Sequence, residues 1–265
     1  MSADKVILIF DIGKTNKKIL LFNEQYDVVL EHSSSFDQIE DEDGFETENV
    51  QALEEWILNS FNEIKNNSRY DIKAVNVSAY GASFVYIDDN GRPILPLYNY
   101  LKPFPEALSS KFEKDYESFN DLALTTASPN LGCLNSGLQV YRIKQEKQEA
   151  YAATKWALHL PQFATYVLSK FPCSDMTSIG CHTMLWDFNQ NAYAKWVIQE
   201  GLDEKLAPIV ALDHVTKNND IQVGIGIHDS SAALIPYLKS FKEPFLLLST
   251  GTWSISLQPF NEEPL

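Results

Sequence analysis

The chain has 265 residues and a mass of 30.0 kDa, which predicts one large domain or two modest ones. Its 36 acidic and 21 basic residues give a net charge of −15, and a surface so acidic repels phosphate backbones and anionic lipids. Nucleic acid and membrane surfaces are therefore excluded as expected partners, and no apolar run approaches the roughly 20 residues of a membrane-spanning helix.

Three short apolar runs open the chain, at residues 5–10, 18–22 and 27–32, with polar turns between them. Runs of this length that are rich in valine, isoleucine and leucine predict strands, and the short turns predict an antiparallel meander. The acidic stretch at residues 37–48 is expected to be a solvated loop without a partner.

A helix and two further strands are expected next. Between residues 49 and 66, apolar side chains recur at spacings of three and four, which predicts one buried helix face. Residues 73–78 alternate as a strand, and residues 84–87 form another that ends at the turn Asp88-Asp89-Asn90-Gly91. A meander followed by a helix and strands is typical of a mixed α/β sheet.

The second half of the chain is predicted to contain more helix. The expected strand-like pieces are a buried segment at 156–160, a strand at 223–227, and a hairpin of residues 245–248 and 253–257. Helices are expected at residues 136–150, 161–170, 192–200 and 230–238. The sequence contains no internal repeat and no low-complexity linker.

Two glycine turns are candidate phosphate sites. The first reads Asp11-Ile12-Gly13-Lys14-Thr15-Asn16, where glycine lets a phosphate approach backbone N–H groups and Asp11 can hold Mg²⁺ through water. Nearby lysines add positive charge to an otherwise acidic protein. The second turn, Ser249-Thr250-Gly251-Thr252, is of the same kind. The two turns together suggest a site that binds one polyphosphate from two sides. A plain polar hairpin turn explains either motif alone.

Asp229 follows the strand-like residues 223–227 and opens a predicted helix. It therefore lies at the carboxyl end of a strand, where open α/β sheets bind their ligands. A carboxylate there can accept the proton of a substrate hydroxyl that attacks phosphorus. An aspartate at a helix start is also a common N-cap, and the two roles are compatible.

Two polar and aromatic stretches follow strand-like runs, at residues 78–83 (SAYGAS) and 98–102 (YNYLK). Their hydroxyls, amides and flat rings suit a sugar, although ordinary loop composition explains them as well.

The order of these motifs resembles the FGGY family of carbohydrate kinases. DIGKTN lies near the N-terminus, GIHDSSAAL follows residue 220, LLLSTGTWS comes just after, and Thr252 lies 23 residues beyond Asp229, as in that family. HDSSAAL and the STGTW turn are most similar to the rhamnulokinase and fuculokinase branch. The resemblance implies a ribonuclease H-like α/β fold, shared with actin, hexokinase and heat-shock 70 proteins, in which helices flank a mixed sheet.

The resemblance also implies a role for each candidate residue. Asp11 would position Mg²⁺, Asp229 would be the catalytic base, and Lys18 stands where many family members have an arginine that reaches the terminal phosphate. ATP would contact Gly13, Lys14, Thr15, Asn16, Lys18, Gly251 and Thr252, and the sugar would contact Ala82, Ser83, Asn99, Tyr100 and Asp229.

The sequence departs from the family at the sugar loops. Ser83 stands where rhamnulokinase-like sequences have an acidic residue, and Asn99-Tyr100-Leu101-Lys102 replaces a YRD-like stretch. The identity of the sugar is therefore left open. One interpretation is ATP-dependent phosphorylation of a ketose or deoxy-ketose such as L-rhamnulose or L-fuculose, and the alternative is a sugar-binding module without catalysis.

Family members continue for about as long again, into a second domain that holds adenosine. We therefore expect residues 1–240 to be the sugar-binding domain and residues 241–265 the first hairpin of a nucleotide-binding domain, so that this chain alone is inactive. Three cysteines without paired spacing predict reduced thiols in a cytoplasmic protein. The expected partner is a small sugar, and a homodimer is left open.

Overall fold

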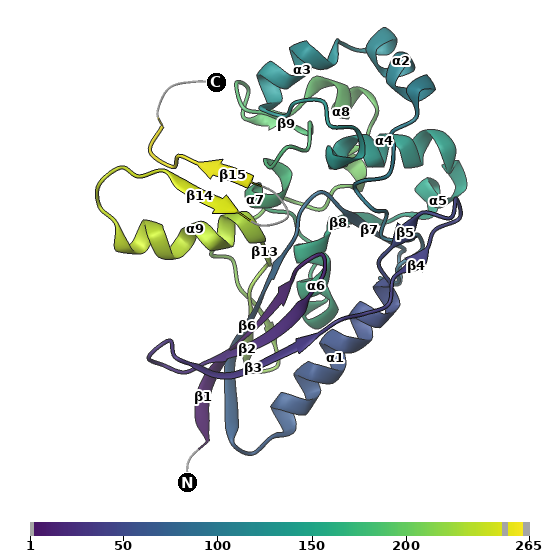
Figure 1. Ribbon diagram of the computed structural model, residues 1–265. Helices are drawn as coiled ribbons and strands as arrows, with labels where there is room; N and C mark the ends of the chain where they lie inside the picture. The colour runs from purple at the N-terminus through teal and green to yellow at the C-terminus, as the bar shows by residue number, and fades with distance from the viewer. Residues whose placement is uncertain (1–2, 251–253, 262–265) are drawn as a thin grey trace.

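A seven-stranded mixed sheet forms one part of the molecule in the computed structural model, which describes residues 3–250 and 254–261 (Figure 1). The N-terminal strands pair antiparallel with one another, which confirms the predicted meander. The strands of this sheet are β1 (Asp4–Ile12), β2 (Lys17–Phe22), β3 (Val28–Ser34), β6 (Tyr70–Ala79), β11 (Thr216–Asn218), β12 (Ile221–Val223) and β13 (Ile227–His228).

β6 is the central strand. It pairs parallel with β1 on one side, and with β12 and then β13 on the other. The single strand predicted at residues 223–227 is therefore wrong: two short strands are separated by a bend. Gly226 makes this bend, because its φ of +80° is a left-handed conformation and a Cβ there would lie 2.3 Å from the Pro161 carbonyl oxygen.

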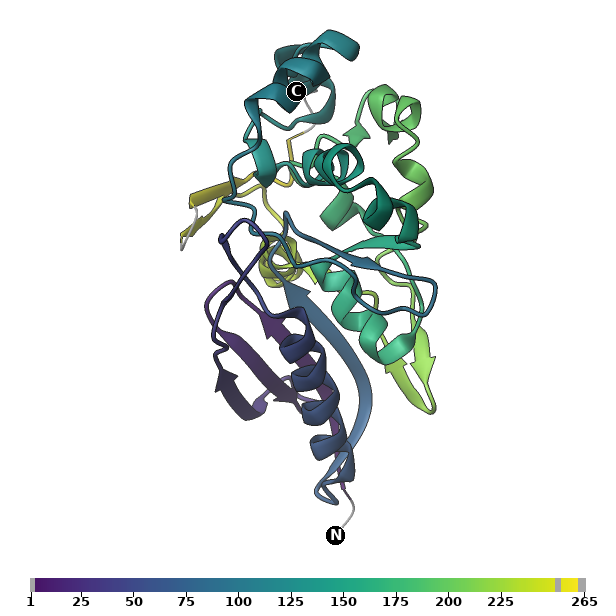
Figure 2. The ribbon, with the colours of Figure 1, turned by 90° about the vertical axis from the view of Figure 1, so that its right-hand side faces the viewer.

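Two helices cover one face of the sheet. Helix α1 (Val50–Asn66) begins at Asn49, whose side chain accepts a hydrogen bond from the Ala52 N–H at 3.0 Å. Helix α6 (Leu160–Ser169) packs beside it (Figure 2). The apolar side of α1 belongs to the same core as alternate residues of β1, because strand side chains alternate between the two faces of a sheet. The predicted fold class is confirmed.

A two-stranded ribbon joins this core to a second one. It consists of β7 (Phe84–Ile87) and β8 (Trp156–His159), and all four residues of β7 are buried. Val85 and Ile87 belong to the sheet core, whereas Phe84 and Tyr86 belong to a core among the helices. Burial on both sides explains why this strand is apolar throughout.

The second core lies in a mainly helical part, the upper region of Figure 1. Phe112 and Phe119 stack there with ring centres 5.0 Å apart, and fully buried Trp196 packs edge-on against Phe112. The sequence predicted neither of the helices that carry these two phenylalanines, because each has few buried apolar positions and so shows weak periodicity. The helices of this part are α2 (Glu106–Asp115), α3 (Phe119–Thr126), α4 (Ser136–Glu146), α5 (Gln148–Ala153) and α8 (Lys195–Gln199).

Several predicted boundaries shift in this region. The helix predicted at residues 136–150 is two helices that meet at Lys147, and the helix predicted at 192–200 is shorter. The remaining elements are β4 (Ile39–Glu40), β5 (Glu46–Thr47), the 3₁₀ turns Gly132–Leu134 and Asp203–Lys205, α7 (Met176–Ile179), β9 (Trp186–Asp187), β10 (Ala192–Tyr193), α9 (Asp229–Ser240), β14 (Leu247–Thr250) and β15 (Ser254–Leu257).

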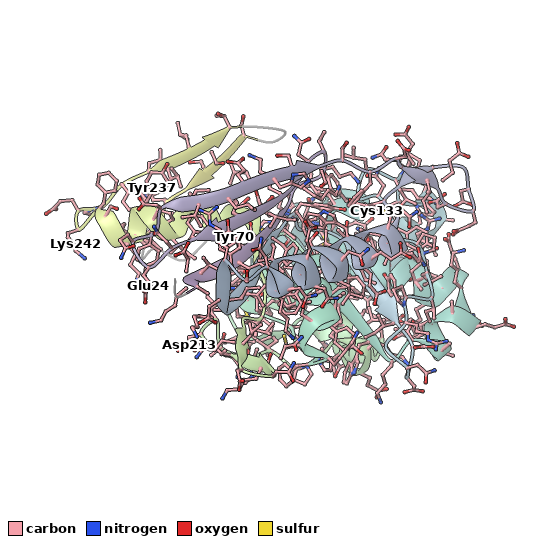
Figure 3. The ribbon with its side chains drawn as sticks, turned by 90° about the horizontal axis from the view of Figure 1, so that it is seen from below. Glu24, Tyr70, Cys133, Asp213, Tyr237 and Lys242 are labelled. Atoms are coloured by element: carbon pink, nitrogen blue, oxygen red, sulfur yellow. The ribbon has the colours of Figure 1, made fainter. Side chains whose placement is uncertain are left out.

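The C-terminal elements project from one side of the molecule. β14 and β15 pair antiparallel, which confirms the predicted hairpin. Figure 3 shows Tyr237 of α9 and Lys242 at the end of the molecule opposite Cys133. The division into residues 1–240 and 241–265 stays a prediction. Within the described ranges, no helix combines the length and apolarity needed to span a bilayer, and the three cysteines are free.

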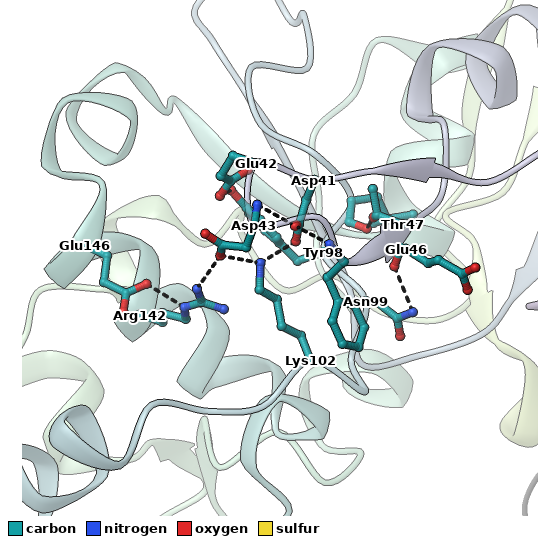
Figure 4. A network of polar contacts seen from close by, with 12 residues as sticks. Asp41, Glu42, Asp43, Glu46, Thr47, Tyr98, Asn99, Lys102, Arg142 and Glu146 are labelled. Carbon is teal, nitrogen blue, oxygen red and sulfur yellow. Dashed lines mark hydrogen bonds and ion pairs between the residues drawn. The ribbon is translucent and has the colours of Figure 1, made fainter.

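The acidic stretch at residues 37–48 is only in part the solvated loop predicted from its charge: most of it is exposed, but Asp41, Thr47 and Glu48 are buried. Asp41 is buried and forms an ion pair with buried Lys102, which also lies 2.7 Å from Asp43 (Figure 4). Arg142 of α4 lies 3.2 Å from Asp43. Burial alone would raise the pKa of Asp41, but hydrogen bonds from Lys102 and from two backbone N–H groups bring it below its ordinary value. Basic side chains that are remote in sequence thus hold the segment at the junction of the two cores.

The end of this segment carries a second buried pair. Glu48 forms an ion pair with Lys17 of β2, and less than a twentieth of either residue is exposed. The Tyr80 hydroxyl donates a hydrogen bond to Glu48 at 2.6 Å. The carboxylate thus connects β2 to the loop that follows β6.

We expect Glu48→Gln to lower the free energy of unfolding by about 3–5 kcal/mol, because the Lys17 ammonium would stay buried without a counter-charge. Glu31→Gln is the matched control: Glu31 pairs with the adjacent Lys18 at 3.0 Å, but that pair is exposed, and exposed pairs contribute little to stability. Urea unfolding of both variants measures the difference. An equal decrease in the free energy of unfolding in both variants would show that the buried pair is no more important for stability than the exposed one.

Candidate active site

Strand pairing brings Asp11 and Asp229 to the same edge of the sheet. Asp11 is in register with Ser78 of β6, and Ile227 of β13 is in register with Ser78 from the other side. Neighbouring strands lie about 4.8 Å apart, so the backbone positions of Asp11 and Ile227 are roughly 10 Å apart. Asp229 comes two residues later and begins α9. The two acidic residues predicted to act together therefore face one another across a single strand.

The two carboxylates repel each other. Burial raises the pKa of Asp11, and the negative charge of Asp229 raises it further, against the lowering effects of a Ser78 hydrogen bond and of Lys18. A cation bound beside Asp11 would relieve this repulsion. The structure thus provides a reason for positive charge at this place, which the sequence could only suggest.

A set of buried polar contacts fixes the position of β13 and therefore of Asp229. The Gly226 N–H donates to the Asn76 side chain at 2.9 Å, and Gln162 donates to the Gly226 carbonyl at 3.2 Å. The His228 N–H donates to the Thr177 hydroxyl at 3.1 Å. Sequence reasoning missed Asn76, Gln162 and Thr177 as positioning residues. The signal that could have identified two of them is a polar residue in an otherwise apolar element: Asn76 in β6 and Gln162 in α6.

Asp229 is the first residue of α9 rather than its N-cap. His228 occupies the N-cap position, so the capping interpretation is wrong by one residue. The Asp229 carboxylate accepts a hydrogen bond from the Ser230 N–H at 2.6 Å, and a negative charge in the first turn interacts favourably with the helix dipole. The Asp229 side chain is 41% exposed, so it remains accessible to a substrate.

Asp229 borders a cavity of about 450 Å³, a size that suits a small molecule. One wall comes from the loop after β6, another from the start of α9, and a third from the hairpin β14–β15. The described residues that line it are Tyr80, Gly81, Ala82, Tyr100, Leu131, Leu134, His182, His228, Asp229, Ser230, Ala233, Ser249, Ser254 and Ile255.

Of the five residues predicted to contact sugar, Ala82, Tyr100 and Asp229 line this cavity, and Ser83 and Asn99 are not among its lining residues. Ser83 is buried, with its hydroxyl 3.5 Å from the Tyr98 carbonyl oxygen. The Asn99 amide donates to the Glu46 carbonyl at 3.0 Å (Figure 4). These two polar side chains satisfy backbone groups inside the fold, which sequence composition cannot distinguish from ligand contacts.

Histidines form a part of the site that sequence reasoning did not single out. Burial lowers the pKa of His182 and of His228, and burial together with these two neighbours lowers the pKa of His159 to about 3. All three rings are therefore neutral at neutral pH. The His228 ring occupies the space of a Cβ on Gly81, since such an atom would lie 2.5 Å from its Nε2. Glycine at position 81 is needed for this packing.

The first glycine turn is a tight connection between β1 and β2. The Gly13 N–H donates to the Asn16 carbonyl at 2.9 Å, and the side chains of Thr15 and Asn16 are exposed. Lys18 is available at the surface in its pair with Glu31.

The other lysines of this turn are already engaged. Lys17 is neutralised by Glu48. The Lys14 ammonium lies 5.4 Å from the ring centres of both Tyr80 and Tyr100, against the wall of the cavity. Of the second turn, Ser249 lines the cavity and Thr250 ends β14, whereas Gly251 and Thr252 lie outside the described residues.

Comparison with known proteins places this arrangement among sugar kinases. The sequence model of the N-terminal domain of the FGGY family of carbohydrate kinases matches residues 6–228. A rhamnulokinase of Mannheimia succiniciproducens is 21% identical over 266 residues, which cover 92% of this chain and 52% of that protein. The chain thus spans about half the length of this curated relative.

Solved structures have the same fold. A carbohydrate kinase from Novosphingobium aromaticivorans superposes with a TM-score of 0.84 at 25% identity, over 97% of this chain and 56% of that one. A ligand-bound xylulose kinase from Lactobacillus acidophilus superposes with a TM-score of 0.72 at 15% identity, over 87% of this chain and 49% of that one. Glycerol kinase from Plasmodium falciparum, solved with ADP, superposes with a TM-score of 0.71 at 18% identity, over 89% of this chain and 50% of that one.

We expect Asp229→Asn to lower the pKa of Asp11, because the substitution removes the neighbouring negative charge that raises it. Carboxyl titration followed by NMR measures this change. Asp213→Asn serves as the control, since Asp213 is exposed and is not among the charges that act on Asp11. An unchanged Asp11 titration in the Asp229 variant would show that the two carboxylates do not share one site.

Proposed function

Because the chain belongs to the FGGY family of carbohydrate kinases, we propose that it provides the sugar-binding part of an enzyme that transfers phosphate from ATP to a sugar hydroxyl. One observation carries the proposal: Asp229 borders a cavity of sugar size and lies across β6 from Asp11. A general base and a cation site on either side of the reacting atoms are what phosphoryl transfer to a hydroxyl requires.

Asp229 would act as the general base. Its Oδ1 atom accepts hydrogen bonds from the Ser230 N–H and hydroxyl, which hold the carboxylate in place. Within the described part of the chain, these contacts leave Oδ2 for the substrate. Oδ2 would take the proton of the attacking hydroxyl as the bond to phosphorus forms. His182 and His228 at the cavity wall would orient the sugar by hydrogen bonds.

The residues around Asp11 fit a magnesium ion. Asp11 offers carboxylate oxygens, the ligands that Mg²⁺ prefers, and the repulsion from Asp229 favours a cation there. When bound, Mg²⁺ neutralises charge on the transferred phosphate. Lys18 can turn to the phosphate readily, because its pair with Glu31 is exposed.

The phosphates of ATP would meet the exposed turn at residues 13–16. Gly251 and Thr252 belong to the same proposal as the second phosphate turn. The adenosine would be held by parts of the enzyme beyond those that form the sugar cavity. A cytoplasmic location, where ATP is available, completes the proposal.

We extend the proposal to a ketose or deoxy-ketose, such as L-rhamnulose or L-fuculose. The likeness to a rhamnulokinase supports this class. The cavity lining supports it as well, because apolar side chains from several of its walls can bury the methyl group of a deoxy sugar. The apolar residues concerned are Ala82, Leu131, Leu134, Ala233 and Ile255.

In the complete enzyme we expect Asp229→Asn to bind sugar normally but to turn over about 10²–10⁴ times more slowly. Asparagine keeps an oxygen for the Ser230 N–H, so the melting temperature should stay close to that of the parent, but it cannot accept the proton. Steady-state kinetics and calorimetry separate the two effects. Near-normal turnover would show that Asp229 is not the base, and the base would then have to be another residue.

For sugar binding we expect Tyr100→Ala to weaken the affinity about tenfold, or about 1.4 kcal/mol, because it removes a ring from the cavity wall. Ser83→Ala is the comparison, since Ser83 is buried outside the lining. Calorimetric titration with L-rhamnulose and L-fuculose measures both. A larger loss of sugar affinity in the Ser83 variant than in the Tyr100 variant would show that Ser83, and not Tyr100, contacts the sugar.

A further inference from the structure

Three side chains that commonly bind transition metals meet beside the cavity: Cys181, His182 and His228. One ligand atom of each lies within 4.8 Å of those of the other two. Both histidines line the cavity, and their ring centres are 6.3 Å apart. No step of the proposed phosphoryl transfer uses Cys181.

Two separate segments hold this cluster. Cys181 and His182 follow α7, and His228 ends β13. His182 has a φ of +43°, a left-handed turn in the chain that lets two successive side chains face the same side. The hydrogen bond from the His228 N–H to the Thr177 hydroxyl ties the two segments together. The cluster is therefore part of the rigid support of Asp229.

The hydrogen bonding of the rings is of the kind found around bound metals. His182 Nδ1 lies 3.3 Å from the Leu134 carbonyl oxygen, an interaction that fixes the ring and leaves Nε2 as the ligand. His228 is 4% exposed, and its Nδ1 has no hydrogen-bond partner among the described residues. Buried polar atoms without partners are uncommon, and a missing ion is one of their explanations.

We propose that Cys181, His182 and His228 bind one zinc-class ion, with its fourth coordination position open to the cavity. A thiolate and two imidazoles select zinc and similar transition metals over magnesium. Metal bonds of about 2.0–2.3 Å in tetrahedral geometry place ligand atoms roughly 3.3–3.7 Å apart, so small side-chain rotations close the site. Binding breaks the S–H bond of Cys181, and its proton passes to solvent.

The ion would lie in the same cavity as the sugar. His228 directly precedes Asp229 and both residues line the cavity, so a metal held there would take up space close to the proposed base. We therefore expect zinc and sugar to exclude each other. This competition rests on the proposed function, whereas the metal site itself does not.

The test is a titration of the protein with Co²⁺, a spectroscopic substitute for Zn²⁺, followed by competition for Zn²⁺ with a coloured chelator. One equivalent of Co²⁺ should bind with thiolate-to-cobalt charge-transfer absorption. Cys181→Ser should abolish that absorption, and His182→Asn should weaken the affinity more than about tenfold. Asparagine is chosen because it tolerates the left-handed conformation at position 182.

Cys173→Ala and His214→Asn are matched controls outside the cluster and should bind like the parent protein. Circular dichroism of each variant shows whether it folds, and either cluster variant alone suffices if the other does not. The metal site would be overturned if the parent protein showed no charge-transfer band. It would also be overturned if both cluster variants bound Co²⁺ as tightly as the parent. If the metal binds as expected but L-rhamnulose leaves its affinity unchanged, the competition fails while the metal site stands.

Discussion

The candidate site depends on the parallel pairing of β6 with strands on both of its sides. Parallel strands end at the same edge of a sheet, so β1 and β13 deliver Asp11 and the chain leading to Asp229 to one place. The register, with Ser78 between Asp11 and Ile227, sets the separation of the two acidic groups. Asn76 and Gln162 hold the short β13 in that register, because two residues of strand pairing alone would bind it weakly.

A second constraint acts at the junction of the two cores. The acidic segment between β4 and α1 is held by Lys102, Arg142 and Lys17, which come from three other parts of the chain. Each buried carboxylate in it has a cationic partner, which is the condition under which burial of charge is tolerated. Through Glu48 and the hydroxyl of Tyr80, this segment also supports the wall of the cavity.

The surroundings of Asp229 bring together two kinds of ligand for cations. Asp11 and Asp229 offer hard oxygen atoms, which suit the proposed Mg²⁺. Cys181 and the two histidines offer softer sulfur and nitrogen atoms that suit zinc. The two sets are adjacent, because Asp229 directly follows His228. A single peptide bond therefore links the base of the proposed transfer reaction to the proposed metal site.

The sequence by itself determined the meander, helix α1, the terminal hairpin, the family, and the candidates Asp11 and Asp229. These features depend on local periodicity and on short motifs, which a linear reading can detect. The tertiary structure decided that Ser83 and Asn99 are buried, that the acidic segment is paired, and that Cys181 and His182 lie near His228. It also supplied Asn76, Gln162 and Thr177 as supports of Asp229. The physical reason is that burial and pairing of polar groups depend on contacts between residues far apart in the chain, and such contacts leave no periodic pattern in the sequence.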